Sequence, residues 1–138
     1  MLFEQVDKNN ILKVVRKNLN KAKKEILVTM LIAEELDNPL PLSYFTLLKK
    51  KVNEGVFLRR LGFGRKEDYN KIKEKNKLES NNYEFRYIVK EFEYQRLIII
   101  DGKKLFLGID GLYFTSTCEP FVEVFLKYFN YNFKKGKI

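Results

Sequence analysis

Two hydrophobic spacings alternate along the first half of the chain. Apolar residues recur at helical spacing in the first segment: Ile11, Val15, Leu19 and Ala22. This period predicts a helix over residues 8–23, with Asp7 as its N-cap. Residues 25–32 then form an apolar run without polar alternation, which is typical of a strand that is covered on both faces.

The same order occurs a second time. Ser43 is the expected cap of a second helix, and Gly55 stands where a helix C-terminal glycine belongs. The inward side of this helix would carry Tyr44, Leu47, Leu48 and Val52. Residues 56–61 predict another buried strand. Helix, strand, helix, strand is the order of a layered α/β unit.

The middle of the chain is more polar. Gly62-Phe63-Gly64 predicts a turn after the second strand. Residues 65–77 are charged almost throughout and predict a surface helix. Residues 83–89 alternate between apolar and polar positions, so they predict a strand with one wetter face.

The clearest local pattern lies further on. Two apolar runs flank Asp101-Gly102, a dipeptide that readily adopts positive φ, and they predict a β-hairpin over residues 96–109. Residues 112–115 would extend its edge, and Pro120 suits the first turn of a final, aromatic-rich helix. The whole chain is expected to form one α/β domain, residues 1–138. Its buried strands are predicted at residues 26–30, 56–61 and 97–100.

The residues that the chain lacks exclude much enzymology. The sequence has 138 residues, no His and a single Cys, which is Cys118. Without His there is no imidazole acid or base, no Ser-His-Asp triad and no ordinary zinc site. One Cys cannot form an internal disulfide. We therefore expect neither a cofactor nor a metal.

No segment predicts a membrane or a secretory route. No apolar run approaches the ~20 residues of a membrane-spanning helix. Glu4 and Asp7 interrupt the region where a signal peptide would be apolar. The expected location is the cytoplasm, where Cys118 would stay a reduced thiol.

The hairpin and its flanks carry a family resemblance. Residues 94–102, Tyr-Gln-Arg-Leu-Ile-Ile-Ile-Asp-Gly, resemble the core motif of the phospholipase D superfamily. In that motif His, any residue, Lys and four further residues precede Asp, usually followed by Gly. Asp101 and Gly102 match it, whereas Tyr94 stands at the His position and Arg96 at the Lys position. Residues 22–28 and 51–59 are similar to the family's first two strand entries.

The chain most resembles the degenerate phospholipase D-like domain of archaeal TrmB-type transcriptional regulators. Such domains bind small ligands, often sugars, or mediate dimerisation, and they are usually joined to a winged-helix DNA-binding domain. The resemblance implies a phospholipase D-like fold, with a mixed central sheet and helices on both faces. It also implies a part in transcription regulation, either as a ligand sensor or as a domain that mediates protein interaction, for example by forming a homodimer.

The same resemblance argues against catalysis. Phospholipase D chemistry needs one His as nucleophile and a second as general acid. Because the chain has no His, dimerisation cannot supply the pair either. The phenol of Tyr94, with an ordinary pKa of ~10, is a poor substitute. We expect a protein that is not an enzyme, and an atypical phosphodiesterase or nuclease is the less favoured alternative.

A candidate ligand site follows from the strand order. Ligands of open α/β sheets bind beyond the carboxyl ends of parallel strands. On one strand, residues 94 and 96 would share a face, and an arginine fork suits carboxylates, phosphates or sugar hydroxyls. The candidate residues for a small anionic or sugar ligand are Tyr94, Arg96, Asp101, Thr29, Thr115 and Ser116.

Structural alternatives remain open for each of these residues. Arg96 could instead pair with Glu91 or Glu93 at the surface, and Asp101 could serve only the turn. The Glu34-Glu35 pair directly follows the first strand. These two carboxylates either join a ligand site there or solvate a loop.

The basic excess suggests a rival function. The net charge is +9, which gives long-range attraction to nucleic acid. The candidate contacts are Lys49, Lys50, Lys51, Arg59 and Arg60. No helix-turn-helix, RNP-like or zinc-finger spacing supports this reading, and a lysine-rich surface is also ordinary solvation. Binding of DNA or RNA would then be weak, indifferent to sequence and sensitive to salt.

Overall fold

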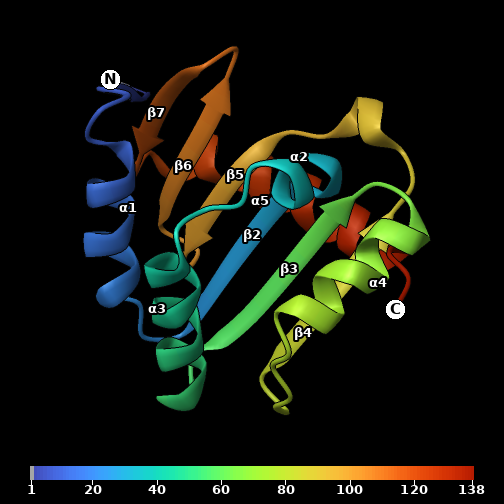
Figure 1. Ribbon diagram of the computed structural model, residues 1–138. Coiled ribbons are helices and arrows are strands. Elements are labelled where there is room, and N and C mark those ends of the chain that lie inside the picture. The colour runs from blue at the N-terminus through green and yellow to red at the C-terminus, as the bar shows by residue number, and fades with distance from the viewer. Residues whose placement is uncertain (1) are drawn as a thin grey trace.

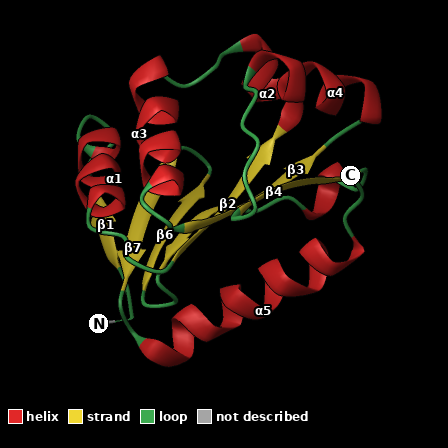
Figure 2. Ribbon diagram, turned by 90° about the horizontal axis from the view of Figure 1, so that it is seen from below, coloured by secondary structure: helices red, strands yellow, loops and turns green. Residues whose placement is uncertain are grey.

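The computed structural model describes residues 2–138 and consists of one seven-stranded sheet with helices on both faces (Figures 1 and 2). From edge to edge the strand order is β1-β7-β6-β5-β2-β3-β4. The strands are β1 (Glu4–Val6), β2 (Glu25–Leu31), β3 (Phe57–Phe63), β4 (Tyr83–Ile88), β5 (Arg96–Ile100), β6 (Lys104–Ile109) and β7 (Leu112–Ser116). The helices are α1 (Ile11–Asn20), α2 (Ile32–Asp37), α3 (Leu42–Asn53), α4 (Lys66–Lys75), the 3-10 turn η1 (Glu91–Glu93) and α5 (Glu119–Lys135).

The sheet is mixed, as the sequence predicts. Strands β2, β3 and β4 run parallel to one another. On its other side β2 pairs antiparallel with β5, which opens the meander β5-β6-β7 and leads to β1 at the edge. Parallel neighbours need crossover connections, which α3 supplies between β2 and β3 and α4 between β3 and β4.

The three strands predicted to be buried are confirmed. Every side chain at positions 26–30 of β2 is buried. In β3 the side chains from Arg60 to the end of the strand are buried, and in β5 Leu97, Ile99 and Ile100 are. Strands β2 and β5 need little polar alternation because both of their faces are covered, whereas β3 is open to solvent near its start, at Phe57 and Arg59.

Helices cover the two faces unequally, as Figure 2 shows from the side. Helix α5 lies alone on one face, where Val122 and Phe129 pack with Leu27 of β2. Helices α1 and α3 lie side by side on the other face, where Val15 and Leu48 form a second cluster of buried residues. Helices α2 and α4 continue that second layer over the parallel strands.

Two predicted helix starts are wrong. Helix α1 begins at Ile11, because Asp7 accepts a hydrogen bond from the backbone N–H of Asn9 (2.8 Å) and so closes a turn before the helix. Helix α3 begins at Leu42, directly after Pro41, and its N-terminus has no side-chain cap. The Ser43 hydroxyl instead accepts a hydrogen bond from Arg16 of α1 (2.9 Å).

The predicted turn at residues 62–64 starts too early, because β3 continues to Phe63. Gly62 lies inside the strand. A glycine fits at this position because a Cβ atom there would approach Ile32 Cδ1 to 2.7 Å. Ile32 begins α2, a six-residue helix directly after β2 that the sequence pattern does not predict. A short helix thus packs on the end of the sheet where a glycine gives it room.

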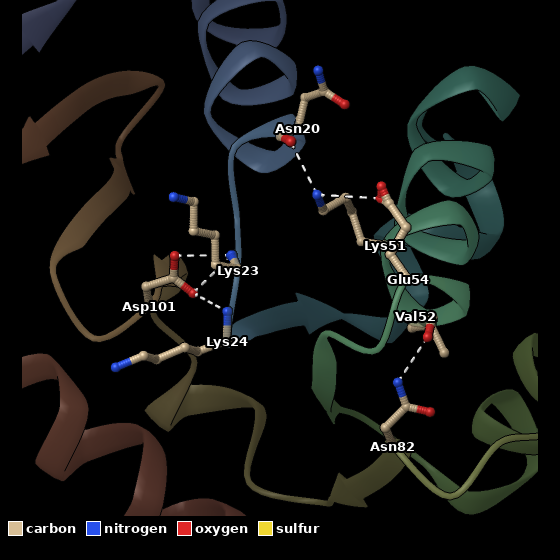
Figure 3. Close-up of polar contacts among 8 residues, drawn as sticks. All are labelled: Asn20, Lys23, Lys24, Lys51, Val52, Glu54, Asn82 and Asp101. Atoms are coloured by element: carbon tan, nitrogen blue, oxygen red, sulfur yellow. Dashed lines mark hydrogen bonds and ion pairs between the residues drawn. The ribbon is translucent and has the colours of Figure 1, made fainter.

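The β5–β6 hairpin forms as predicted, and its turn has a second role (Figure 3). Asp101 and Gly102 adopt positive φ of 54° and 65°. The Asp101 carboxylate accepts hydrogen bonds from the backbone N–H groups of Lys23, Lys24 and Glu25, at 2.7–3.2 Å. It therefore ties the turn to the segment that leads from α1 into β2. Although partial burial opposes this, the three N–H groups lower the pKa of Asp101 below its ordinary value.

We expect Asp101→Asn to destabilise the fold by about 1–2 kcal/mol above pH 5, because asparagine keeps the positive φ but loses the charged acceptor. A carboxyl group with a lowered pKa in the folded state stabilises above its unfolded pKa and stops doing so as pH falls through the folded value. The difference between wild type and Asp101→Asn should therefore shrink in acid. Urea unfolding at several pH values measures it.

Asp110 provides the matched control, because it also precedes a glycine in a hairpin turn and has a positive φ of 49°. Its side chain makes no hydrogen bond within residues 2–138. Asp110→Asn should change the free energy of unfolding by less than about 0.5 kcal/mol. Equal losses in the two variants would show that Asp101 acts only through its turn.

Candidate functional site

A partly enclosed cavity of about 180 Å³ lies where the chain leaves the parallel strands. It borders the carboxyl end of β2 and lies between the sheet and the N-terminal turns of α1 and α3. Its apolar lining comes mainly from Ile11, Leu12, Val15, Val28, Ile98, Phe45 and Phe106. Its charged lining is Glu34, Glu35, Arg60 and Arg96. This is the end of the sheet at which ligands of open α/β folds bind.

Arg96 pairs with Glu34, not with Glu91 or Glu93. Its guanidinium donates a hydrogen bond to the Glu34 carboxylate, which α2 carries over the end of the sheet. Both side chains are partly exposed at the cavity. Glu34 and Glu35 lie on helix α2 and line the cavity, so they do not lie in the loop that the solvation alternative assumed.

Tyr94 also lines the cavity, but it does not share a strand face with Arg96. Strand β5 begins at Arg96, so Tyr94 lies before it, and strand alternation does not apply. Its ring packs 5.5 Å from that of Phe63, and its hydroxyl is buried without a hydrogen-bond partner. Burial raises the pKa of Tyr94 well above its usual range, which disfavours the phenolate that nucleophilic attack would need.

Arg60 reaches the same cavity from β3. Its side chain is only 3% exposed, which removes it from the surface where the sequence analysis placed it as a nucleic-acid contact. The guanidinium lies over the rings of Phe85 and Phe45, at 4.8 and 5.6 Å from their centroids. Alternation along the strand explains the position, because Arg59 lies on the opposite face.

The other ligand-site candidates lie apart from one another. Thr29 lines the cavity, where its hydroxyl donates to the Gln95 carbonyl (2.6 Å) and accepts from the Leu97 N–H (2.9 Å). Asp101 lies at the opposite end of β5, in the turn already described. Thr115 and Ser116 are on β7, where both hydroxyls donate to backbone carbonyls, those of Leu105 and Leu2. The structure thus brings together three of the six: Thr29, Tyr94 and Arg96.

The basic candidates are likewise divided. Lys50 is exposed and Lys49 half-buried on α3. Lys51 is buried, and its ammonium donates to the Asn20 carbonyl (3.0 Å) and pairs with Glu54 (Figure 3). Arg59 is partly exposed and lies 3.7 Å from Glu25 and 3.9 Å from Glu84. Lys51 and Arg60 therefore face the interior.

Tyr44 and Phe45 are cavity residues that sequence reasoning did not single out. Both belong to the inward side of α3, and Tyr44 was expected there only as core. Burial raises the pKa of Tyr44 to about 12. A hydrophobic period identifies an inward face but cannot show that part of that face borders an empty space.

Two further tests bear on chemistry. Within residues 2–138 no cluster of three or more Asp, Glu, Cys or His side chains could hold a metal ion. Across the same residues, none of the helices has the length and apolar character needed to cross a membrane.

The architecture defines a phospholipase D-like fold. Among solved structures it is similar to TrmBL2, described as an archaeal chromatin protein with a novel mode of DNA binding (TM-score 0.76, 16% identity); the alignment covers 99% of this chain but only 54% of that one. NucT from Helicobacter pylori aligns with a TM-score of 0.69 and 11% identity, over 98% of each chain. Nuc from Salmonella typhimurium, a phospholipase D family member, aligns with a TM-score of 0.66 and 12% identity, over 98% of this chain and 94% of that one.

These likenesses establish the fold, and they agree with the resemblance to TrmB-type proteins. No protein-family model and no curated protein matches the sequence. The chain spans about half the length of TrmBL2.

Glu35 provides a test of the electrostatics at the cavity. Burial raises its pKa, and the nearby Arg60 and Lys75 only partly offset that rise. A carboxyl group with a raised pKa in the folded state destabilises at pH values above that pKa and has no effect below its unfolded pKa. We expect Glu35→Gln to raise the melting temperature at neutral pH and to match wild type below about pH 4.

The measurement is thermal unfolding of both proteins across that pH range. Asp37→Asn, which removes an exposed carboxylate at the end of the same helix, is the control and should change little. A melting temperature for Glu35→Gln below that of wild type at neutral pH would mean that attraction to Arg60 outweighs burial.

Proposed function

We propose that this chain is a non-catalytic phospholipase D-like domain that senses a small ligand in transcription regulation. The observation that carries the proposal is the cavity at the carboxyl end of β2, which is lined by apolar walls and a few charged groups. A mostly apolar cavity with a small number of polar groups is the usual form of a small-molecule site.

The groups at the motif positions support binding over turnover. Arg96 is held in an ion pair with Glu34, and the Tyr94 hydroxyl is buried with a raised pKa. The sequence contains no His that could form a phosphoenzyme or protonate a leaving group. Residual phosphodiester turnover, if it occurred, would have to depend on Tyr94.

The regulatory part of the proposal draws on the fold. TrmBL2 is a chromatin protein that binds DNA, and this chain aligns with about half of it. A ligand-sensing part of a larger regulator, or a separate partner of one, would fit such a relation. Interaction with a second copy of the chain remains a prediction that light scattering can test.

We expect a small molecule that binds the cavity to raise the melting temperature of the protein by mass action. A thermal-shift screen with sugars, carboxylates and phosphates identifies it, and calorimetry confirms the binding. Ile98→Phe, which adds volume to a lining residue, should abolish the shift, whereas Val124→Phe on the exposed side of α5 should leave it unchanged.

A ligand that stabilises wild type and Ile98→Phe equally would place binding outside the cavity. A complete lack of stabilising molecules, or hydrolysis of a generic phosphodiester that Tyr94→Phe abolishes, would contradict the proposed function.

Nucleic-acid binding is the second candidate, favoured by the net charge of +9. The basic groups that remain accessible are mostly lysines spread over the surface, so we expect weak binding, without sequence preference, whose affinity falls steeply with salt. Charge reversal at Lys49 and Lys50 should weaken it more than reversal at Lys73 and Lys77 of the α4 region, which changes the net charge equally. Fluorescence anisotropy with duplex DNA measures both pairs.

Tight, sequence-selective binding at high salt would contradict this expectation. Equal losses from the two pairs would mean that net charge, rather than the α3 surface, determines the affinity.

A further inference from the structure

Arg60 is a buried cation whose hydrogen-bonding capacity is only partly used. One terminal nitrogen donates to the Tyr83 hydroxyl (3.2 Å), and the other lies 3.7 Å from the Met30 sulfur, a weak acceptor. Its Nε atom is buried without any partner. Since Arg60 also lines the cavity, a group that binds there can reach the guanidinium.

Arg60 also has no carboxylate in direct contact, and its attraction to Glu35, which lines the same cavity, acts at longer range. Within residues 2–138 no carboxylate oxygen lies within 4.0 Å of its guanidinium. Arg59 and Arg96, which are far more exposed, each have a glutamate partner. Burial of an ion without a directly contacting counter-ion is costly, and stacking on two aromatic rings offsets only part of that cost.

We infer that the cavity binds a small organic monoanion with an apolar body, and that Arg60 binds its carboxylate. The inference rests on the proposed function, since it names the ligand of that cavity. A carboxylate would supply both a counter-charge in direct contact and the missing acceptor. The rings of Phe45 and Phe85, whose centroids lie 5.6 and 4.8 Å from the guanidinium carbon, restrict how the fork can turn.

The rest of the cavity limits the charge and size of the ligand. Arg96 already pairs with Glu34, so only the guanidinium of Arg60 is left to neutralise a negative charge on the ligand. Glu35 would repel a second negative charge. The walls beyond Arg60 are mostly aliphatic and aromatic, so they favour a ligand whose body is mainly apolar. A volume of about 180 Å³ is slightly larger than the ~150 Å³ cavity that holds benzene.

The experiment compares benzoate and hexanoate with their neutral amides, and with phenyl phosphate, by calorimetry. We expect wild type to bind the two carboxylates more tightly than their amides or the phosphate. Arg60→Met should weaken carboxylate binding by at least about tenfold, since it removes the charge but keeps much of the side-chain volume. Arg59→Met, one residue away on the opposite face, should leave it unchanged.

Thermal unfolding without ligand provides a second readout. Because burial of the charge is costly, Arg60→Met should keep or raise the melting temperature of the ligand-free protein. Arg60→Lys keeps the charge but loses the fork, so it should lie between wild type and Arg60→Met in affinity. A variant that loses stability while carboxylate affinity is unchanged would assign Arg60 a purely structural role and overturn the inference.

The outcomes separate the inference from the function on which it rests. One outcome would be that neutral molecules bind to wild type and to Arg60→Met equally but not to Ile98→Phe. This result would overturn the preference for an anion and keep the ligand-sensing role. Stronger binding of phenyl phosphate than of benzoate would overturn the preference for a single charge. Carboxylates that bind equally to wild type and Ile98→Phe would overturn the cavity as their site.

Discussion

Strand β2 is the element on which the rest of the structure depends, because it is the one strand that joins the parallel and antiparallel parts of the sheet. It pairs parallel with β3 on one side and antiparallel with β5 on the other. At its start the Asp101 carboxylate binds the backbone N–H groups of the incoming segment. At its end the chain turns directly into α2, which brings Glu34 and Glu35 over the cavity. The strand pairing therefore determines where the charged groups of the cavity lie.

Burial on both faces explains which elements the sequence predicts well. A strand covered on both faces favours apolar residues at every position, so β2 and β5 leave clear apolar runs, whereas β3 is interrupted by Arg59 and Arg60. Helix α2 has six residues and β1 has three, too few to establish any period, and neither was predicted. The start of α1 was misplaced because Asp7 satisfies a nearby N–H group in a turn, an alternative open to any aspartate before a helix.

The sequence predicts the position of the candidate site in the fold but only some of the residues that line it. Strand order indicated the carboxyl end of the parallel strands, and the motif resemblance indicated Tyr94 and Arg96, which line the cavity together with Thr29. Arg60 was wrongly predicted to lie at the surface, because two consecutive arginines do not indicate which side chain faces the interior. The pairing of Arg60 with Val28 and Phe85 across the sheet decides this, and only the folded chain provides it. The single sequence signal was that a strand expected to be buried on both faces contained a charge.

The two arginines of the cavity differ in whether a carboxylate contacts the guanidinium. Arg96 stands where the family resemblance places a catalytic lysine, but its charge is taken up by Glu34. Arg60, on β3, has no such partner and lies deeper. The cavity itself is formed by strand ends and by the first turns of α1 and α3, none of which depends on a catalytic group. The space therefore exists without the histidine pair that the family motif contains, and in our proposal the charge of Arg60 determines what occupies it.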